Sequence, residues 1–140
     1  MTDLAKKLGI MPGDRVCILD APPEAGRAIR EAAPGGVEFF DQLAGEAYNV
    51  VLFWPRELEG LERRFASYTA YIVPGGAIWA VMPKKKFAAQ RGVSFTWEEM
   101  QAAGLLTDLV DNKVAAVTEE DYGTRFVIRK ERRMNYGKPA

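Results

Sequence analysis

The segment Pro12–Gly26, PGDRVCILDAPPEAG, constrains the fold more than any other part of the chain. Arg15–Asp20 is a short apolar run between polar residues, which is typical of a strand buried on both faces. Pro23 can occupy the first position of a helix, so the segment predicts a strand that leads directly into a helix. In α/β proteins this junction usually holds a glycine-rich loop, whereas here it carries Pro22, Pro23 and Glu24.

The composition is that of one ordinary folded domain, with informative gaps. A chain of 140 residues with 48% hydrophobic residues fits one domain with a proper core. Nineteen basic residues balance nineteen acidic ones, so the net charge gives no general attraction to nucleic acid or membranes. The chain has no histidine, which excludes Ser-His-Asp and Cys-His catalysis and removes the commonest metal ligand. Cys17, the only cysteine, lies in an apolar run and is expected to be a buried hydrophobe, so no metal site is predicted.

Neither a membrane span nor a signal peptide is expected. No apolar run approaches the ~20 residues that a spanning helix needs. The first residues, MTDLAKKLGIMPGD, lack the apolar core of a signal peptide. These features predict a cytoplasmic protein.

Apolar runs, helical spacing and turn residues predict the elements along the chain. Strands are expected at Arg15–Asp20, Val37–Asp41, Tyr48–Trp54, Ala77–Met82, Val110–Thr118 and Thr124–Lys130. Helices are expected at 2–8, Pro23–Ala33, Glu57–Ile72 and Thr96–Ala103, the last with a capping box formed by Thr96 and Glu99. Pro74-Gly75-Gly76 is expected to end the third helix, and Pro83–Gly92 to form a basic loop.

Alternating strands and helices predict an α/β fold, a three-layer sandwich around a mostly parallel sheet with right-handed crossovers. A short turn at Glu120–Gly123 joins the last two strands into a C-terminal antiparallel hairpin. We expect a single domain over residues 1–131 and a loose polar tail over residues 132–140.

Four motifs along the chain match, in order and spacing, those of one large family. Gly9 with Pro12–Val16 leads into the first strand, and Leu19-Asp20 ends it. Tyr48–Pro55, YNVVLFWP, and Ile72–Ala77, IVPGGA, match the strand of the fourth motif and the turn that follows its helix. Together they resemble a class I S-adenosylmethionine-dependent methyltransferase with parts deleted. The resemblance spans nearly the whole chain and implies a Rossmann-like sheet of order 2-1-3-4-6-5, with strands numbered along the chain.

The chain is more similar still to a group of small uncharacterised bacterial proteins. The shared features are the PGDRV opening, a tryptophan-containing fourth strand that leads into Pro-Lys-Lys, and the ending DNKVAAV…RF. This second resemblance indicates a bacterial origin and implies no particular activity.

The cofactor loop departs from the methyltransferase pattern, acid-x-Gly-x-Gly-x-Gly. Asp20 fits the acid and Gly26 fits the last glycine, but Pro22 and Glu24 occupy the other two glycine positions. Proline fixes φ and removes an N–H donor, and the Glu24 carboxylate would repel the methionine carboxylate of the cofactor. The pyrophosphate of NAD or FAD would be opposed in the same way. We therefore expect that S-adenosylmethionine binding has been lost.

If S-adenosylmethionine does bind, the resemblance implies that Asp20, Gly26, Asp41 and Trp54 form its site. Asp41 ends the second strand, where an acid would bind ribose hydroxyls, although a solvated turn residue is the plainer interpretation. Trp54 lies at the carboxyl end of a strand, where open α/β sheets bind ligands. It would line a pocket there, or fill the space that the cofactor left.

Two further family features are missing. The Asp/Asn-Pro-Pro-Tyr motif of amino-group methyltransferases is replaced by Phe53–Arg56, which keeps only one matching proline. No strand–helix unit lies between the second strand and Tyr48, where the complete fold has one that helps to wall the adenine. The catalytic residues of a methyl transfer therefore stay unassigned.

Several charged groups have a functional and a plain interpretation. Lys84, Lys85 and Lys86 could bind an anion at the carboxyl end of the sheet, or form a solvated loop. The lysines lack the interleaved aromatic residues of a single-strand nucleic-acid platform. Asp111–Lys113 are interpreted as edge-strand charges that oppose aggregation, and the basic segment Arg129–Arg133 as a solvated end.

Three functions stay open. The preferred one is a methyltransferase-like domain that has lost its cofactor and acts as a binding or interaction module for an unidentified protein or small molecule. The alternative is a small active S-adenosylmethionine-dependent methyltransferase with a non-standard loop. The third is an anion binder that uses Lys84–Lys86, with nucleic acid as the less favoured ligand. A homodimer is also expected, because a sheet stripped of one strand–helix unit exposes apolar edge.

Overall fold

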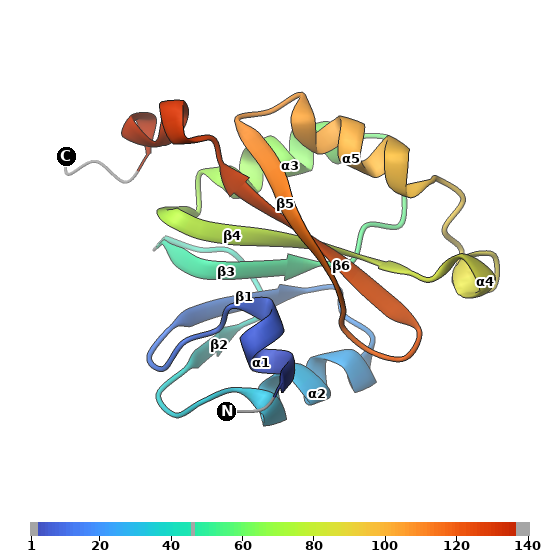
Figure 1. Ribbon diagram of the computed structural model, residues 1–140, viewed down its shortest axis with the longest axis horizontal. Helices are drawn as coiled ribbons and strands as arrows, with labels where there is room; N and C mark the ends of the chain where they lie inside the picture. The colour runs from blue at the N-terminus through green and yellow to red at the C-terminus, as the bar shows by residue number, and fades with distance from the viewer. Residues whose placement is uncertain (1–2, 46, 137–140) are drawn as a thin grey trace.

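The computed structural model describes residues 3–45 and 47–136 of the chain. The strands are β1 Arg15–Leu19, β2 Glu38–Phe40, β3 Tyr48–Phe53, β4 Ile72–Pro83, β5 Leu109–Ala116 and β6 Asp121–Ile128. The helices are α1 Asp3–Leu8, α2 Pro23–Ala32, α3 Leu61–Thr69, α4 Lys85–Ala88, α5 Trp97–Leu105 and the 3-10 helix η1 Lys130–Asn135. Figure 1 shows one twisted sheet with helices packed on both of its faces.

The sheet confirms the expected fold class and strand order. Its order is β2-β1-β3-β4-β6-β5. β1 pairs in parallel with β2 and β3, and β3 pairs in parallel with β4. β6 is antiparallel to both β4 and β5, so the hairpin inserts its second strand next to β4 and leaves β5 at the edge (Figure 1). The parallel strands end together, and that common carboxyl edge is where open α/β sheets bind ligands.

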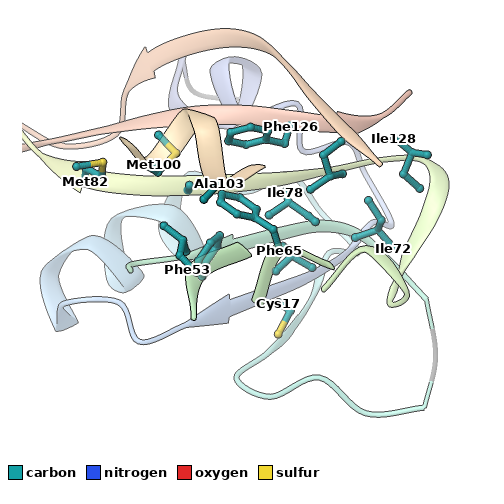
Figure 2. Packing of buried hydrophobic residues seen from close by; sticks show 14 of the residues in the cluster. Cys17, Phe53, Phe65, Ile72, Ile78, Met82, Met100, Ala103, Phe126 and Ile128 are labelled. Carbon is teal, nitrogen blue, oxygen red and sulfur yellow. The ribbon is translucent and has the colours of Figure 1, made fainter. Parts of the chain in front are cut away.

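Two apolar layers hold the helices on the sheet, one on each face. The first lies under α3 and α5, where Phe53, Phe65 and Phe126 pack with Met100 and with the fully buried Cys17 (Figure 2). The second lies under α1 and α2 and contains alternate strand residues, among them the fully buried Trp79. Side chains that alternate between the two layers explain why the central strands are apolar throughout.

The third helix is shorter than predicted, and the prediction for the following segment is wrong. α3 ends at Thr69, and Pro74-Gly75-Gly76, expected to terminate the helix, lies inside β4. Tyr48 pairs with Ile72 and Val50 with Ala77, so β4 contains a bulge of extra residues at this point. A Cβ on Gly76 would lie 2.9 Å from the carbonyl oxygen of Asn49, so a close approach to β3 requires glycine here.

Three local boundaries also differ from the predictions. The segment Pro83–Gly92, expected as a loop, contains the short helix α4. The capping box at Thr96 is confirmed, with Oγ1 accepting from the Glu99 amide at 3.1 Å. α5 continues through Gly104 instead of ending there, because this glycine lets the ring of Phe126 pack against the helix. The last strand starts three residues earlier than expected, at Asp121.

The chain beyond β6 is more ordered than the sequence predicts. η1 begins within the single domain predicted for 1–131 and extends into the expected tail. Arg132 lies 3.5 Å from the Asp108 carboxylate, and the Tyr136 hydroxyl donates a hydrogen bond to the same residue. Burial and this hydrogen bond raise the pKa of Tyr136 to about 12. Residues 137–140 of the predicted tail lie outside the described residues.

Within residues 3–45 and 47–136, no helix is long and apolar enough to cross a membrane.

Candidate functional site

Asp20 ends β1 in a strained backbone conformation. Its φ of 60° lies in the left-handed region that favours glycine, and it is the one non-glycine residue with a positive φ among those described. The Asp20 carboxylate lies 3.5 Å from Nη2 of Arg64 on α3. The Arg64 side chain donates to the Tyr68 hydroxyl at 2.9 and 3.0 Å and lies over the ring of Phe53. The acid at the end of the first strand is therefore directed towards an arginine of the protein itself.

The first turn of α2 offers few amide donors to a ligand. Pro22 is the N-cap residue, with no side-chain cap, and Pro23 opens the helix. Because neither proline has an amide hydrogen, the turn presents only the amides of Glu24 and Ala25, and Glu24 also adds a carboxylate. Gly26 donates its amide to the Pro22 carbonyl at 3.0 Å, as in any helix. A Cβ at Gly26 would make an ordinary contact of 3.8 Å, so packing does not require glycine there.

Trp54 directly follows β3, and its side chain is hydrogen-bonded to the first residue of β6. Its indole Nε1 donates to Oδ2 of Asp121 at 3.1 Å. Arg91 donates to both oxygens of the same carboxylate, at 2.8 and 3.2 Å. Trp54 and Asp121 are 4% and 2% exposed, so this network is buried. The hydrogen bonds to Asp121 and its charge raise the pKa of the Arg91 guanidinium. Trp54, Asp121 and Arg91 are called the Trp54 network below.

The space at the carboxyl ends of the strands is divided. Beside the Trp54 network, between Pro22, Trp54 and Pro83, the remaining cavity is about 20 Å³. Two larger, open depressions are lined in part by Asp20. One, of about 520 Å³, is lined by Asp20, Gly26 and Asp41, and the other, of about 580 Å³, by Asp20, Trp54 and Arg64.

The four residues predicted for a cofactor site are thus only partly brought together. Asp20, Gly26 and Asp41 share one depression, while Trp54 does not line it and shares the other depression with Asp20. Burial and, to a smaller extent, the negative charge of Asp41 raise the pKa of Cys17 to about 11. This cysteine is fully buried, as predicted, and its thiol stays protonated at neutral pH.

The predicted basic loop lies at the end of β4. Lys84 is the N-cap residue of α4 and is half-buried, while Lys85 and Lys86 are exposed in that short helix. The Lys84 amide donates to the Glu120 carbonyl at 2.7 Å, and Lys86 lies over the ring of Phe87. The three ammonium groups are attached at the same edge as the Trp54 network but do not line its cavity.

Sequence reasoning missed three residues that organise this edge: Arg64, Arg91 and Asp121. The sequence gives Arg64 no role, and it predicts a basic loop around Arg91 and a hairpin turn around Asp121. Their partners are 44, 30 and 67 positions away, so no local pattern could have paired them. The signal available in the sequence was weak. Asp121 is an acid in a predicted turn, and Trp54 is a tryptophan at the end of a predicted strand.

A scan against protein-family models and a search of curated proteins found no match. Solved structures of similar fold do exist. A putative type 11 methyltransferase from Sulfolobus solfataricus superposes with a TM-score of 0.58 at 10% identity, over 91% of this chain and 90% of that chain. A TehB-like SAM-dependent methyltransferase from Corynebacterium glutamicum gives 0.57 at 8% identity, over 90% and 87%. A S-adenosylmethionine-dependent methyltransferase from Clostridium acetobutylicum gives 0.57 at 6%, over 89% and 87%.

These comparisons define the fold class of the chain. It has the class I methyltransferase-like fold in a small, truncated form, as the sequence motifs predict. At such low identities the likeness concerns the fold and not the chemistry, because unrelated activities share this architecture.

Proposed function

We propose that this chain is a methyltransferase-like domain that no longer binds S-adenosylmethionine and acts as an interaction module. The observation that carries the proposal is the Trp54 network. Between Trp54 and Pro22 the remaining cavity is about 20 Å³, while ligand pockets are typically ~300–1,000 Å³. A buried indole with a hydrogen-bonded N–H is also costly to displace, because the Asp121 carboxylate would lose a partner.

The opening of α2 supports the same proposal. Two prolines remove amide donors from the turn that would face the methionine carboxylate, and Glu24 adds a charge of the same sign. Asp20 is already paired with Arg64, so a ligand would have to compete with that ion pair.

The competing proposal is an active methyltransferase with a non-standard loop. The open depression lined by Asp20, Gly26 and Asp41 favours it, since its volume of about 520 Å³ lies within the usual range of ligand pockets. The strained φ of Asp20 favours it as well, because such strain is common at binding sites.

Thermal unfolding with 1 mM S-adenosylmethionine or S-adenosylhomocysteine separates the two proposals. A ligand at about 100 times its Kd adds about 2.7 kcal/mol of stability, which is a shift of several degrees in Tm. We expect no shift, with a methyltransferase of known cofactor binding as the positive control. A shift that Asp41→Asn abolishes, and Glu62→Gln on α3 leaves intact, would establish the competing proposal.

The interaction role needs a surface, and the groove between α3 and α5 supplies one. It has a volume of about 680 Å³ and is lined by apolar Leu58, Ala66, Ala102, Ala103 and Leu106. Leu106 is 71% exposed and Leu58 is 38% exposed. By contrast, the aromatic residues of the edge strand β2 are partly covered, with Arg15 over Phe40 and Arg30 over Phe39.

We propose that a second copy of the chain occupies the α3–α5 groove. The groove rim carries both signs of charge, with Arg63 on α3 and Glu99 on α5, so a twofold-related copy can pair each with the other. A mass measurement by light scattering should give about 31 kDa, twice the 15.6 kDa chain. Leu106→Lys should give the monomer, while Met134→Lys, equally exposed at 70% but on η1, should not. A monomeric wild-type mass at 100 µM would contradict the homodimer.

A further inference from the structure

Three basic side chains from separate elements gather around the last strands. In the β5–β6 register Lys113 is directly opposite Arg125, so both side chains point to the same face of the sheet. The Lys113 ammonium donates to the Lys7 carbonyl at the end of α1, at 2.8 Å, which identifies this face as the one that α1 covers. Lys6 and Lys7 are exposed there as well.

Arg133 joins this pair from η1. Its Nε donates to the carbonyl oxygen of Ile128, at the end of β6, at 3.0 Å. The side chain therefore folds back from η1 onto the strand that carries Arg125. Ile128 follows Arg125 by three residues on β6, so the Arg133 side chain reaches the strand close to Arg125. Burial and, less strongly, the positive charge of Arg133 lower the pKa of Arg125.

No carboxylate forms an ion pair with these three side chains in the part of the chain that the structure describes. Ion pairs there join Arg15, Arg64, Arg91 and Arg132 to carboxylates, but none includes Lys113, Arg125 or Arg133. Arg125 Nη1 donates to the neutral amide oxygen of Asn112 at 3.3 Å. Like charges directly opposite one another on paired strands, with one half-buried, destabilise a sheet. The fold thus maintains an arrangement that costs stability.

We propose that Lys113, Arg125 and Arg133 form a binding site for a phosphate group. Within the described residues, no hydrogen bond uses Nε or Nη2 of Arg125, or the two terminal nitrogens of Arg133. Forked guanidinium donors match the several oxygens of a phosphate, and three cations suit its charge of nearly −2 better than the single charge of a carboxylate.

This site is separate from the places considered above. Lys84–Lys86 follow Pro83, which pairs with Asp121 at the start of β6, whereas Arg133 contacts Ile128 at its end. The proposal does not depend on the loss of S-adenosylmethionine binding or on the α3–α5 groove. The phosphate can belong to a small phosphorylated molecule or to a nucleic-acid backbone.

Titration of the full chain with inorganic phosphate, against chloride at matched ionic strength, tests the site. Amide chemical shifts should move saturably, with the largest changes at residues 112–113, 125 and 133. Arg125→Gln and Arg133→Gln should each weaken binding at least tenfold. Arg132→Gln, on the same 3-10 helix but paired with Asp108, should leave it unchanged. Absence of saturable binding, or equal binding by Arg125→Gln, would overturn the proposal.

Two further arms identify the source of the phosphate and guard against misfolding. Tighter binding of pyrophosphate than of a short single-stranded oligonucleotide would assign the site to small molecules, and the reverse order would assign it to nucleic acid. In either case the binding must be weakened in Arg125→Gln. Without phosphate, Arg125→Gln should unfold at the wild-type Tm or above it, because it removes repulsion and no ion pair. A lower Tm for Arg125→Gln would show that its charge stabilises the fold and would contradict the argument.

Discussion

Arg91→Met should destabilise the chain strongly, because it removes one partner of a buried ion pair. Arg91 donates to both oxygens of Asp121 at 2.8 and 3.2 Å. The Asp121 side chain is 2% exposed, so its carboxylate would be left poorly solvated, and among the described residues only the Trp54 indole would remain as a side-chain donor. Methionine keeps most of the length and apolar surface of the arginine stem, so the change isolates the charge and hydrogen bonds.

The expected cost is about 3 kcal/mol. Removing one partner of a fully buried pair costs ~3–5 kcal/mol, and the 25% exposure of the Arg91 side chain places this pair at the lower end. The surface pair of Arg132 and Asp108 is a matched control: its atoms are 3.5 Å apart and its side chains are 55% and 31% exposed. Arg132→Met should therefore cost under ~1 kcal/mol.

Urea unfolding followed by tryptophan fluorescence measures both variants. We expect a lower midpoint for Arg91→Met with an unchanged m-value, and a drop in Tm of about 10 °C. The double variant Arg91→Met with Asp121→Asn should recover part of the loss, since no buried charge is then left unpaired. Equal, small costs for Arg91→Met and Arg132→Met would refute the view that this network closes the sheet edge.

Three further predictions concern the core and one helix. Because the folded pKa of Cys17 is about 11 against 9.0 in the unfolded chain, its contribution to stability is present below pH 9 and lost towards pH 11. Between pH 9 and pH 11, urea unfolding should show that the free energy of unfolding falls by at most about 2.7 kcal/mol more in the wild type than in Cys17→Ala. Gly104→Ala should lower the urea midpoint although alanine has the higher helix propensity, because the new Cβ would lie 2.4 Å from the Phe126 ring. A higher midpoint would contradict this packing. Thr96→Ala should cost about 1 kcal/mol, and no measurable change would argue against the capping box.

The sequence predicts the architecture well because the signals for it are local. The apolar run that became β1, the proline that opens α2 and the capping box at Thr96 each act within a few residues. The order of such elements, with the methyltransferase-like motifs, was enough for the strand order. The failure at Pro74-Gly75-Gly76 shows the limit, because a bulge depends on the neighbouring strand and not on local propensity.

The candidate site was predicted less completely. The sequence identifies Pro22 and Glu24 at positions that usually need bare backbone, and Trp54 at a strand end where ligands usually bind. It does not reveal that Asp121 and Arg91 hold Trp54, since these residues meet only when the hairpin inserts beside β4. Nor does it reveal the cluster of Lys113, Arg125 and Arg133, which depends on the β5–β6 register and on the return of η1.

The sequence by itself determined the α/β class and the absence of histidine chemistry, because composition and short-range periodicity specify them. Only the tertiary structure decided where the charges went. Asp20 and Asp121 form ion pairs with arginines from other elements. Arg125 instead lies near two other cations, Lys113 and Arg133. The physical reason is that Coulomb energy depends on distance in space and on burial, and chain order fixes neither.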